Sequence, residues 1–325
     1  MMDRFRQVVI AGPGGPETLV LTDRAMLRPD AGQLLIRVTA AGVNRHDVNQ
    51  RQAGHHHDGN PVPGLEVAGT VAKVGEGVTG WAKGDPVMAL VQGGGYAEYA
   101  LADARVSLSP PAHLALQEAA ALPEALFTTA WNFFHLMRLQ PGETALVHGG
   151  TSGVGHLALQ LLSALGHTVY ATAGTPAKCA AARDFGAARA FDYHAPNLAQ
   201  LVIEATGGRG VDTLLDMSAG AHLEADLAMM APGGRIAHLA PGKGTVLPVP
   251  LRLLMEKRIA ITGSLLRPLA PALKAQVAET LRELLAKVGR TLRPHIAATY
   301  ALDNAAKAHR AMERGAHVGK ILLIP

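Results

Sequence analysis

The sequence predicts an α/β protein with two parts, a β-rich domain and a doubly wound parallel sheet. A glycine-rich turn joins the short apolar run 144–148 to an amphipathic helix that ends at Gly166. Strand-like and helix-like runs then alternate up to residue 266, as they do in parallel sheets with crossover helices. The first hundred residues differ, because short strand-like runs are separated there by Gly and Pro, which is typical of a barrel-like all-β domain.

Composition restricts the function. A chain of 325 residues with 48% hydrophobic content suggests two domains with real cores. The single Cys179 excludes an intrachain disulfide and a four-cysteine zinc lobe. The N-terminus lacks a signal-peptide core and no apolar run reaches membrane-spanning length, so we expect a cytoplasmic protein. The net charge is only +4 with interspersed signs, which disfavours nucleic acid or a membrane as the main partner.

The elements follow in order along the chain. The β-rich part should contain strands at 7–10, 18–22, 33–41, 67–74, 84–90 and 96–101. Helices are expected at 117–122 and 125–138, broken by Pro123. In the sheet, strands are expected at 144–148, 168–173, 190–191, 211–217, 234–240 and 259–266, with helices at 154–165, 177–185, 198–206, 221–230 and 251–257.

The tail changes pattern again, with helices at 271–288 and 305–314 and strands at 297–302 and 320–324. It exceeds what the parallel sheet needs, so we expect it to return to the first domain and complete it. The predicted parts are therefore 1–122 for the first domain, 123–266 for the parallel sheet and 267–325 for the return. Pockets commonly lie between domains, so we expect the active-site cleft there.

The glycine-rich turn predicts a dinucleotide site. Glycines let the backbone turn tightly and let a pyrophosphate approach it, and the start of the next helix favours negative charge. The spacing is a shifted variant of the usual fingerprint, and a purely structural turn is the alternative reading. The residues expected to hold the phosphates are Gly150, Thr151, Ser152, Gly153, Val154 and Gly155.

Short motifs along the whole chain carry a family likeness. They are Gly14-Gly-Pro-Glu17, Gly42-Val-Asn-Arg-His-Asp47, Gln50-Arg-Gln52, Gly64-Leu-Glu-Val-Ala-Gly69, Gly84-Asp85, Gly93-Gly-Gly95, Leu122-Pro-Glu124, Gly263-Ser-Leu-Leu-Arg267 and Gly319-Lys320. With them the chain resembles the zinc-independent quinone oxidoreductases of the medium-chain dehydrogenase/reductase superfamily, the ζ-crystallin-like enzymes, and within these the p53-inducible quinone-reductase branch. The resemblance implies a GroES-like catalytic domain around a Rossmann domain. It further implies NADPH as hydride donor, a quinone or another electron-poor carbonyl compound as acceptor, and a homodimer.

The same resemblance argues against a catalytic metal. Alcohol dehydrogenases of this architecture place zinc ligands at the positions that here hold Asn44 and Leu65, and the remaining Glu66 cannot make a tetrahedral site alone. The adjacent His55, His56 and His57 cannot easily converge on one ion, and we interpret them as solvated loop residues.

Two residues are expected beside the reacting groups. Asn44 is the polar candidate by its place in the motif, with a turn-forming role as the alternative. His55 stands where the branch has a tyrosine, so either it replaces that tyrosine or the loop and the acceptor preference have drifted. Asp47 is expected to pack or cap locally. The cofactor carries the hard chemistry, so no nucleophile is required.

The choice of NADPH over NADH can be argued from the second strand. An NAD-specific turn has an acidic residue there for the ribose hydroxyl, and residues 170–178 contain none. Thr175 can cap the next helix, and the resemblance places a 2′-phosphate there with Gly174, Lys178 and Tyr193. A plain helix cap with a solvated lysine is the alternative reading.

Further cofactor contacts follow from the resemblance alone. They are Thr128, Leu239, Ala240, Ser264, Leu265, Leu266 and Lys320, although core packing also explains the leucines.

The sequence therefore predicts an NADPH-dependent quinone reductase. An enone or enal reductase, or a non-catalytic NADPH-binding redox sensor, are the alternatives.

Overall fold

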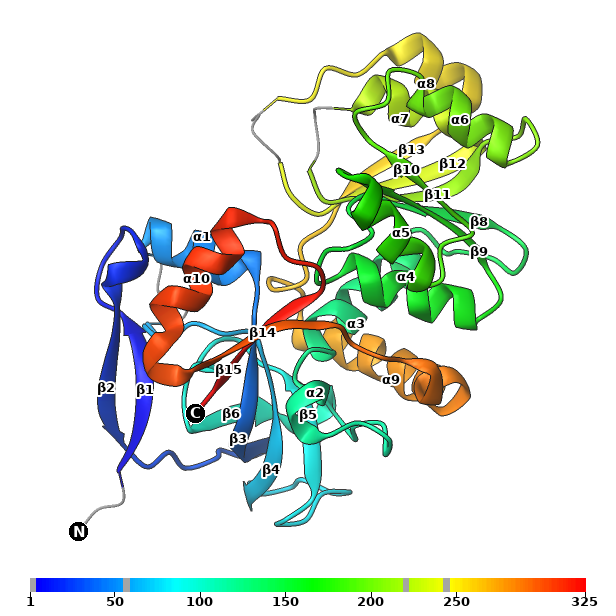
Figure 1. The fold of residues 1–325 in the computed structure, drawn as a ribbon. Helices are drawn as coiled ribbons and strands as arrows, with labels where there is room; N and C mark the ends of the chain where they lie inside the picture. The colour runs from blue at the N-terminus through cyan, green and yellow to red at the C-terminus, as the bar shows by residue number, and fades with distance from the viewer. Residues whose placement is uncertain (1–3, 55–58, 219–221, 242–245) are drawn as a thin grey trace. The chain divides into compact units, whose positions relative to one another are not determined.

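The computed structural model describes residues 4–54, 59–218, 222–241 and 246–325. The chain divides into two compact units, which are described separately (Figure 1). Unit 1 comprises Met1–Phe127 with Ala270–Pro325, and unit 2 comprises Thr128–Leu269. No helix in the described part of the chain is long and apolar enough to cross a membrane.

Unit 1 is a mixed β structure that also contains α-helices. Its strands are β1 (Arg4–Ile10), β2 (Leu19–Ala25), β3 (Gln33–Val43), β4 (Glu66–Val74), β5 (Pro86–Leu90), β6 (Tyr99–Asp103), β7 (Ser107–Leu108), β14 (Ile296–Ala301) and β15 (Lys320–Ile324). Its helices are α1 (Arg45–Ala53), α2 (Leu116–Ala119), α9 (Pro271–Val288) and α10 (Ala305–Arg314). β1 and β2 form an antiparallel hairpin, and the large sheet runs β14-β15-β3-β4-β5-β7 with β6 paired to β3.

Strands from the first hundred residues and from the C-terminal tail meet in the large sheet. β15 pairs antiparallel with β3, with Leu322 opposite Gly42. One hydrophobic core then combines β3 residues such as Ile36 with Met312 of α10 and Ile321 of β15. The tail therefore completes the sheet that the first hundred residues begin, and it brings Lys320 to the end of β3.

Unit 2 is a six-stranded parallel sheet in the order β10-β9-β8-β11-β12-β13. Its strands are β8 (Thr144–Val147), β9 (Thr168–Ala173), β10 (Arg189–Asp192), β11 (Val211–Asp216), β12 (Met230–His238) and β13 (Ala260–Gly263), and its helices include α4 (Gly155–Ala164), α5 (Pro176–Asp184), α6 (Leu198–Ala205), α7 (Leu223–Met229) and α8 (Leu251–Lys257). One core contains residues of α4 and α5, and another contains residues of α6 and α7. The predicted α/β fold class is confirmed.

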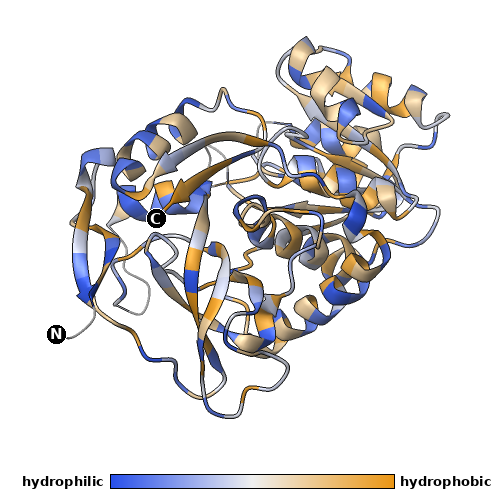
Figure 2. Cartoon of the chain, turned by 60° about the horizontal axis from the view of Figure 1, so that its bottom comes forward, coloured by the Kyte–Doolittle hydropathy of each residue, from blue (hydrophilic) through white to orange (hydrophobic). Residues whose placement is uncertain are grey.

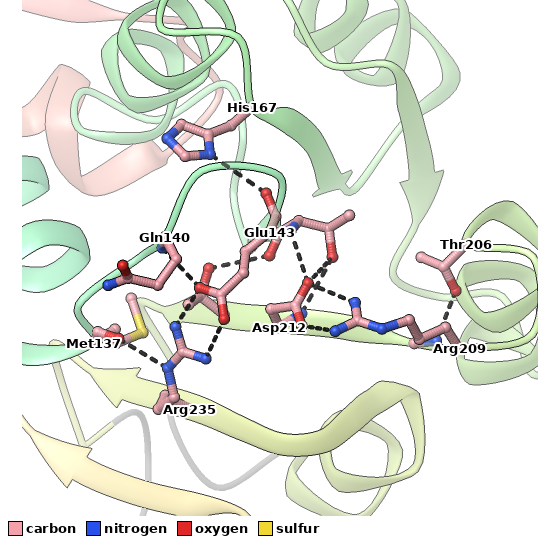
Figure 3. A network of polar contacts seen from close by, with 11 residues as sticks. Met137, Gln140, Glu143, His167, Thr206, Arg209, Asp212 and Arg235 are labelled. Atoms are coloured by element: carbon pink, nitrogen blue, oxygen red, sulfur yellow. Dashed lines mark hydrogen bonds and ion pairs between the residues drawn. The ribbon is translucent and has the colours of Figure 1, made fainter.

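A polar network holds the amino ends of three of these strands together (Figure 3). Arg235 of β12 makes a bidentate contact with Glu143, at 2.9 and 2.5 Å, just before β8. The carboxylate of Asp212 in β11 accepts a 2.8 Å hydrogen bond from the Thr144 N–H and is paired with Arg209. Because these groups satisfy one another, this edge of the sheet is structural, and the opposite, carboxyl edge remains for a ligand.

Two local predictions were wrong. The first hundred residues were predicted to be β-rich with no helix at 45–53, whereas these residues form α1. It also expected one helix over 125–138, whereas α3 (Pro123–Ala130) is followed by a π-helical turn over Trp131–Leu136. The helices carry both apolar (orange) and polar (blue) residues, as expected for helices that bury one face (Figure 2).

Candidate functional site

Asn44 lies at the junction of β3 and α1, at the N-cap of the helix. Its backbone is extended, with φ −123° and ψ 157°, and its side chain makes no capping hydrogen bond. The helix start is satisfied instead by Asp47, whose Oδ2 accepts a 2.8 Å hydrogen bond from the Asn44 N–H. The local turn therefore leaves the Asn44 amide group free to face other partners.

Those partners are two buried, oppositely charged residues. Asn44 Nδ2 donates to Glu66 Oε1 at 2.8 Å, and Asn44 Oδ1 accepts from Lys320 Nζ at 2.7 Å. Lys320 Nζ also donates to Glu66 Oε1, while Glu66 Oε2 accepts from the Glu124 N–H at 2.9 Å. Glu66 and Lys320 are 0% and 1% exposed. These contacts fix which way the Asn44 amide points, so its second N–H remains available to an acceptor.

This cluster does not fit a zinc ion. The carboxylate of Glu66 and the amide oxygen of Asn44 are already engaged by the Lys320 ammonium group. Leu65 beside them is buried and offers no ligand atom. Within the described ranges, no three His, Cys, Asp or Glu side chains are grouped as a metal site would need.

The glycine-rich turn lies between β8 and α4 in unit 2. A Cβ atom on Gly155 would come within 2.2 Å of the Gly149 carbonyl oxygen, and one on Gly150 within 2.6 Å of the Ala171 Cβ. Ser152 Oγ accepts a 2.9 Å hydrogen bond from the Gly155 N–H, the first N–H of α4. The turn thus needs glycine for close packing, and the half-buried residues Ser152, Gly153 and Val154 lead into the start of a helix, where a phosphate can bind.

The residues expected around a 2′-phosphate are brought together after β9. Thr175 caps α5 by accepting a 3.2 Å hydrogen bond from the Lys178 N–H. Tyr193 follows β10, and its N–H donates to the Ala173 carbonyl at 3.1 Å. A Cβ on Gly174 would lie only 2.3 Å from the Tyr193 hydroxyl, so the bare glycine makes room for that ring. The start of α5, a half-buried lysine and a tyrosine therefore meet at one corner.

A buried polar layer under the carboxyl edge was not predicted. His148 Nε2 and Nδ1 lie 2.8 Å from Asp226 Oδ1 and Thr172 Oγ1, and His238 Nδ1 lies 3.1 Å from Asp216 Oδ2. Burial alone lowers the pKa of His148, but its hydrogen bond to Asp226 and the charge of that carboxylate outweigh burial and raise the pKa. Each histidine follows or ends a parallel strand, a position that could have indicated the layer.

The other expected residues are placed as follows. Leu239 and Ala240 follow β12, and Ser264, Leu265 and Leu266 follow β13, at the same carboxyl edge as the glycine turn. Ser264 is 7% exposed, and its hydroxyl has no hydrogen-bond partner among the described residues. Thr128 is buried in α3, where its carbonyl accepts from the Asn132 side chain. His55 lies outside the described residues.

Comparisons with known proteins agree with this fold. A model for the alcohol dehydrogenase GroES-like domain matches residues 30–112, and one for zinc-binding dehydrogenases matches residues 153–286. The quinone oxidoreductase of Sus scrofa is 35% identical over 319 residues, which cover 96% of this chain and 95% of that protein. A mycobacterial protein whose structure was solved with NADPH is 29% identical, with a TM-score of 0.86 and coverage of 98% and 100%. The CurK enoyl reductase is 26% identical, with a TM-score of 0.85 and 99% coverage of both chains.

A parallel sheet with a glycine turn at its carboxyl edge, joined in one chain to a GroES-like unit, defines a nicotinamide-dependent oxidoreductase. The chain belongs to the medium-chain dehydrogenase/reductase superfamily and is similar to its quinone oxidoreductases over nearly its whole length.

Proposed function

We propose that this protein reduces quinones with NADPH and without a metal ion. The proposal rests on the side-chain amide of Asn44. Glu66 and Lys320 hold this amide in one orientation, in which the second N–H of Nδ2 can donate to a substrate. A quinone accepts hydride readily and needs only hydrogen bonds to its oxygens. The similarity to quinone oxidoreductases supports this class of acceptor.

In the proposed reaction the reduced nicotinamide, when bound, supplies the hydride. Asn44 donates its remaining N–H to the acceptor oxygen and so stabilises the negative charge that develops there. Lys320 polarises the amide, since its ammonium group donates to Asn44 Oδ1 at 2.7 Å. Glu66 prevents the amide from flipping, since it accepts from Nδ2.

The preference for NADPH is proposed from the corner formed by Gly174, Thr175, Lys178 and Tyr193. No carboxylate lies between residues 170 and 178 to receive a ribose hydroxyl. The start of α5 and the Lys178 side chain favour a 2′-phosphate instead. The related structure solved with NADPH supports the same choice.

Reduction of enones or enals is the second candidate. The likeness to an enoyl reductase favours it, since the two chains cover each other almost completely. It requires a proton to be delivered to carbon as well as a hydride. Turnover of enones faster than quinones under the same conditions would favour this reading.

Asn44→Ala should lower kcat for quinone reduction by about 10²- to 10³-fold, the loss typical of one hydrogen-bond donor to a developing oxyanion. NADPH binding to the glycine turn should persist. Steady-state kinetics with a simple quinone and titration with NADPH measure the two effects. Asn304→Ala, a change outside the cluster in the same unit, is the matched control. Equal kcat values for the Asn44 variant and the wild type would refute the assigned role.

Metal removal should leave activity intact, because the oxygens of Glu66 and Asn44 are held by Lys320. Elemental analysis should find less than one zinc per chain, and dialysis against a chelator should leave kcat unchanged. One tightly bound zinc per chain whose removal abolishes turnover would overturn this proposal.

We further propose a homodimer through β13. β13 is the last strand in the order of the parallel sheet. Leu251 and Met255 of the preceding helix α8 and Leu265, which follows β13, are 65%, 71% and 66% exposed. An open edge strand with apolar neighbours suits antiparallel pairing with its own copy. Sedimentation should give twice 33.9 kDa for the wild type and a monomer for Met255→Asp. A monomeric wild type would contradict the dimer.

A further inference from the structure

A chain of buried side chains connects Asn44 to the C-terminal helix α10. Asp47 Oδ2, which holds the Asn44 N–H, also accepts a 3.1 Å hydrogen bond from the Tyr96 hydroxyl. The Tyr96 oxygen lies 3.0 Å from His309 Nε2, and His309 Nδ1 lies 3.4 Å from Arg51 Nη1. The side chains of Asp47, Tyr96, His309 and Arg51 are all between 0% and 1% exposed.

The hydrogen bonds that connect these side chains all run in one direction, from Arg51 towards Asp47. Arg51 can only donate, so His309 Nδ1 must accept and the ring proton lies on Nε2. Nε2 then donates to Tyr96, whose hydroxyl donates to the Asp47 carboxylate. Burial, together with the charges of Arg51 and Arg45, lowers the pKa of His309 to about 3, so the ring is neutral with a single proton.

At the end away from Asn44, this series of hydrogen bonds is held by helix α10. Arg51 Nη2 pairs with Glu313 at 2.5 Å, and Arg45 donates to the Met312 carbonyl at 2.8 Å. At the near end, Asp47 Oδ1 accepts a 3.3 Å hydrogen bond from the Gly64 N–H, two residues before Glu66. Asn44 is thus held twice, by its backbone through Asp47 and by its side chain through Glu66 and Lys320.

We propose that Tyr96 and His309 are positioning residues for Asn44, through which helix α10 sets the geometry of acceptor reduction. Neither touches the reacting groups. Both act through Asp47, which fixes the backbone at the N-cap of α1 and with it the position from which the Asn44 side chain extends. This inference rests on the proposed role of Asn44 as hydrogen-bond donor.

Tyr96→Phe removes the central hydroxyl and keeps the ring. Misplacement of a catalytic group by about 1 Å costs up to about a hundredfold in rate, so we expect kcat to fall about tenfold or more. The Kd for NADPH should not change. Ser107→Ala removes another buried hydroxyl of unit 1, bonded to the Asp103 carbonyl, and should leave kcat unchanged. Hydrogen exchange at the backbone N–H of Asn44, which donates to Asp47, should become faster in Tyr96→Phe and should not change in the control.

His309 offers a rescue test. His309→Leu removes the hydrogen bonds to Arg51 and Tyr96. In His309→Gln the side-chain amide can accept from Arg51 and donate to Tyr96, so kcat should recover in the glutamine variant. Unchanged kcat and unchanged Asn44 exchange in folded Tyr96→Phe and His309→Leu would overturn the inference. The exchange measurement does not depend on turnover, so a failure of the proposed function alone would leave it readable.

Discussion

Lys320→Met is expected to destabilise unit 1 by about 3–5 kcal/mol, the usual cost of leaving one partner of a buried ion pair alone. The methionine would strand the Glu66 carboxylate, which is 0% exposed. Asn44 Oδ1 would lose its donor at the same time. The rate of quinone reduction should therefore fall in addition to the free energy of unfolding. Urea unfolding of the wild type and the variant measures the free energy difference.

Two further variants separate charge from packing. Lys307→Met changes an exposed lysine of α10 and should cost little. The double variant Lys320→Met with Glu66→Gln removes both charges and should recover part of the lost stability, because no unpaired charge stays buried. If Lys320→Met costs no more than Lys307→Met, the buried pair does not contribute as the structure indicates.

Lys178→Ala is expected to weaken NADPH binding by about ten- to a hundredfold, which corresponds to the loss of a charge-assisted hydrogen bond of roughly 1.5–3 kcal/mol. NADH lacks the 2′-phosphate, so its affinity should hardly change. The contrast between the cofactors matters more than the loss itself, since damage to the fold would weaken both. Isothermal titration of each protein with each cofactor measures the contrast.

The matched control is Arg183→Ala, which removes a positive charge from the last turn of the same helix α5. It should leave both affinities unchanged, because the charge lies far along the helix from Thr175. A wild type that prefers NADH, or a Lys178→Ala variant that loses both cofactors equally, would show that the 2′-phosphate site is misplaced.

The parallel sheet could be predicted well because each of its elements carries a local signal. Helix α8 over Leu251–Lys257 and strand β9 over Thr168–Ala173 have the expected bounds. The apolar pattern sets both, with Pro250 before α8 and with Gly166 and Gly174 on either side of β9. Helix α1 could not be found by periodicity, because only Val48 is apolar among its first eight residues. Its signals were the ends alone, with Asn44 and Asp47 at the start and Gly54 in the left-handed conformation after the end.

The candidate site was only partly predictable for a different reason. Asn44 and Lys320 were singled out from short motifs, but the hydrogen bond between them joins residues 276 positions apart. Lys320 was expected near the cofactor, and the structure shows it buried against Asn44 and Glu66. Tyr96 and His309 carry no local signal, since their roles arise only when β15 and α10 return to the first sheet. Side-chain partners of this kind depend on the tertiary fold, which sequence patterns do not contain.

The most direct test of the proposed function is a panel of acceptors supplied with NADPH and with NADH, followed by the absorbance of the reduced nicotinamide. Simple quinones and enones should be compared at equal concentrations with the wild-type protein. We expect NADPH to be oxidised rapidly with quinones, more slowly with enones, and poorly when NADH replaces it. No oxidation of NADPH with any quinone or enone would contradict the proposal and would favour a nucleotide-binding protein without turnover.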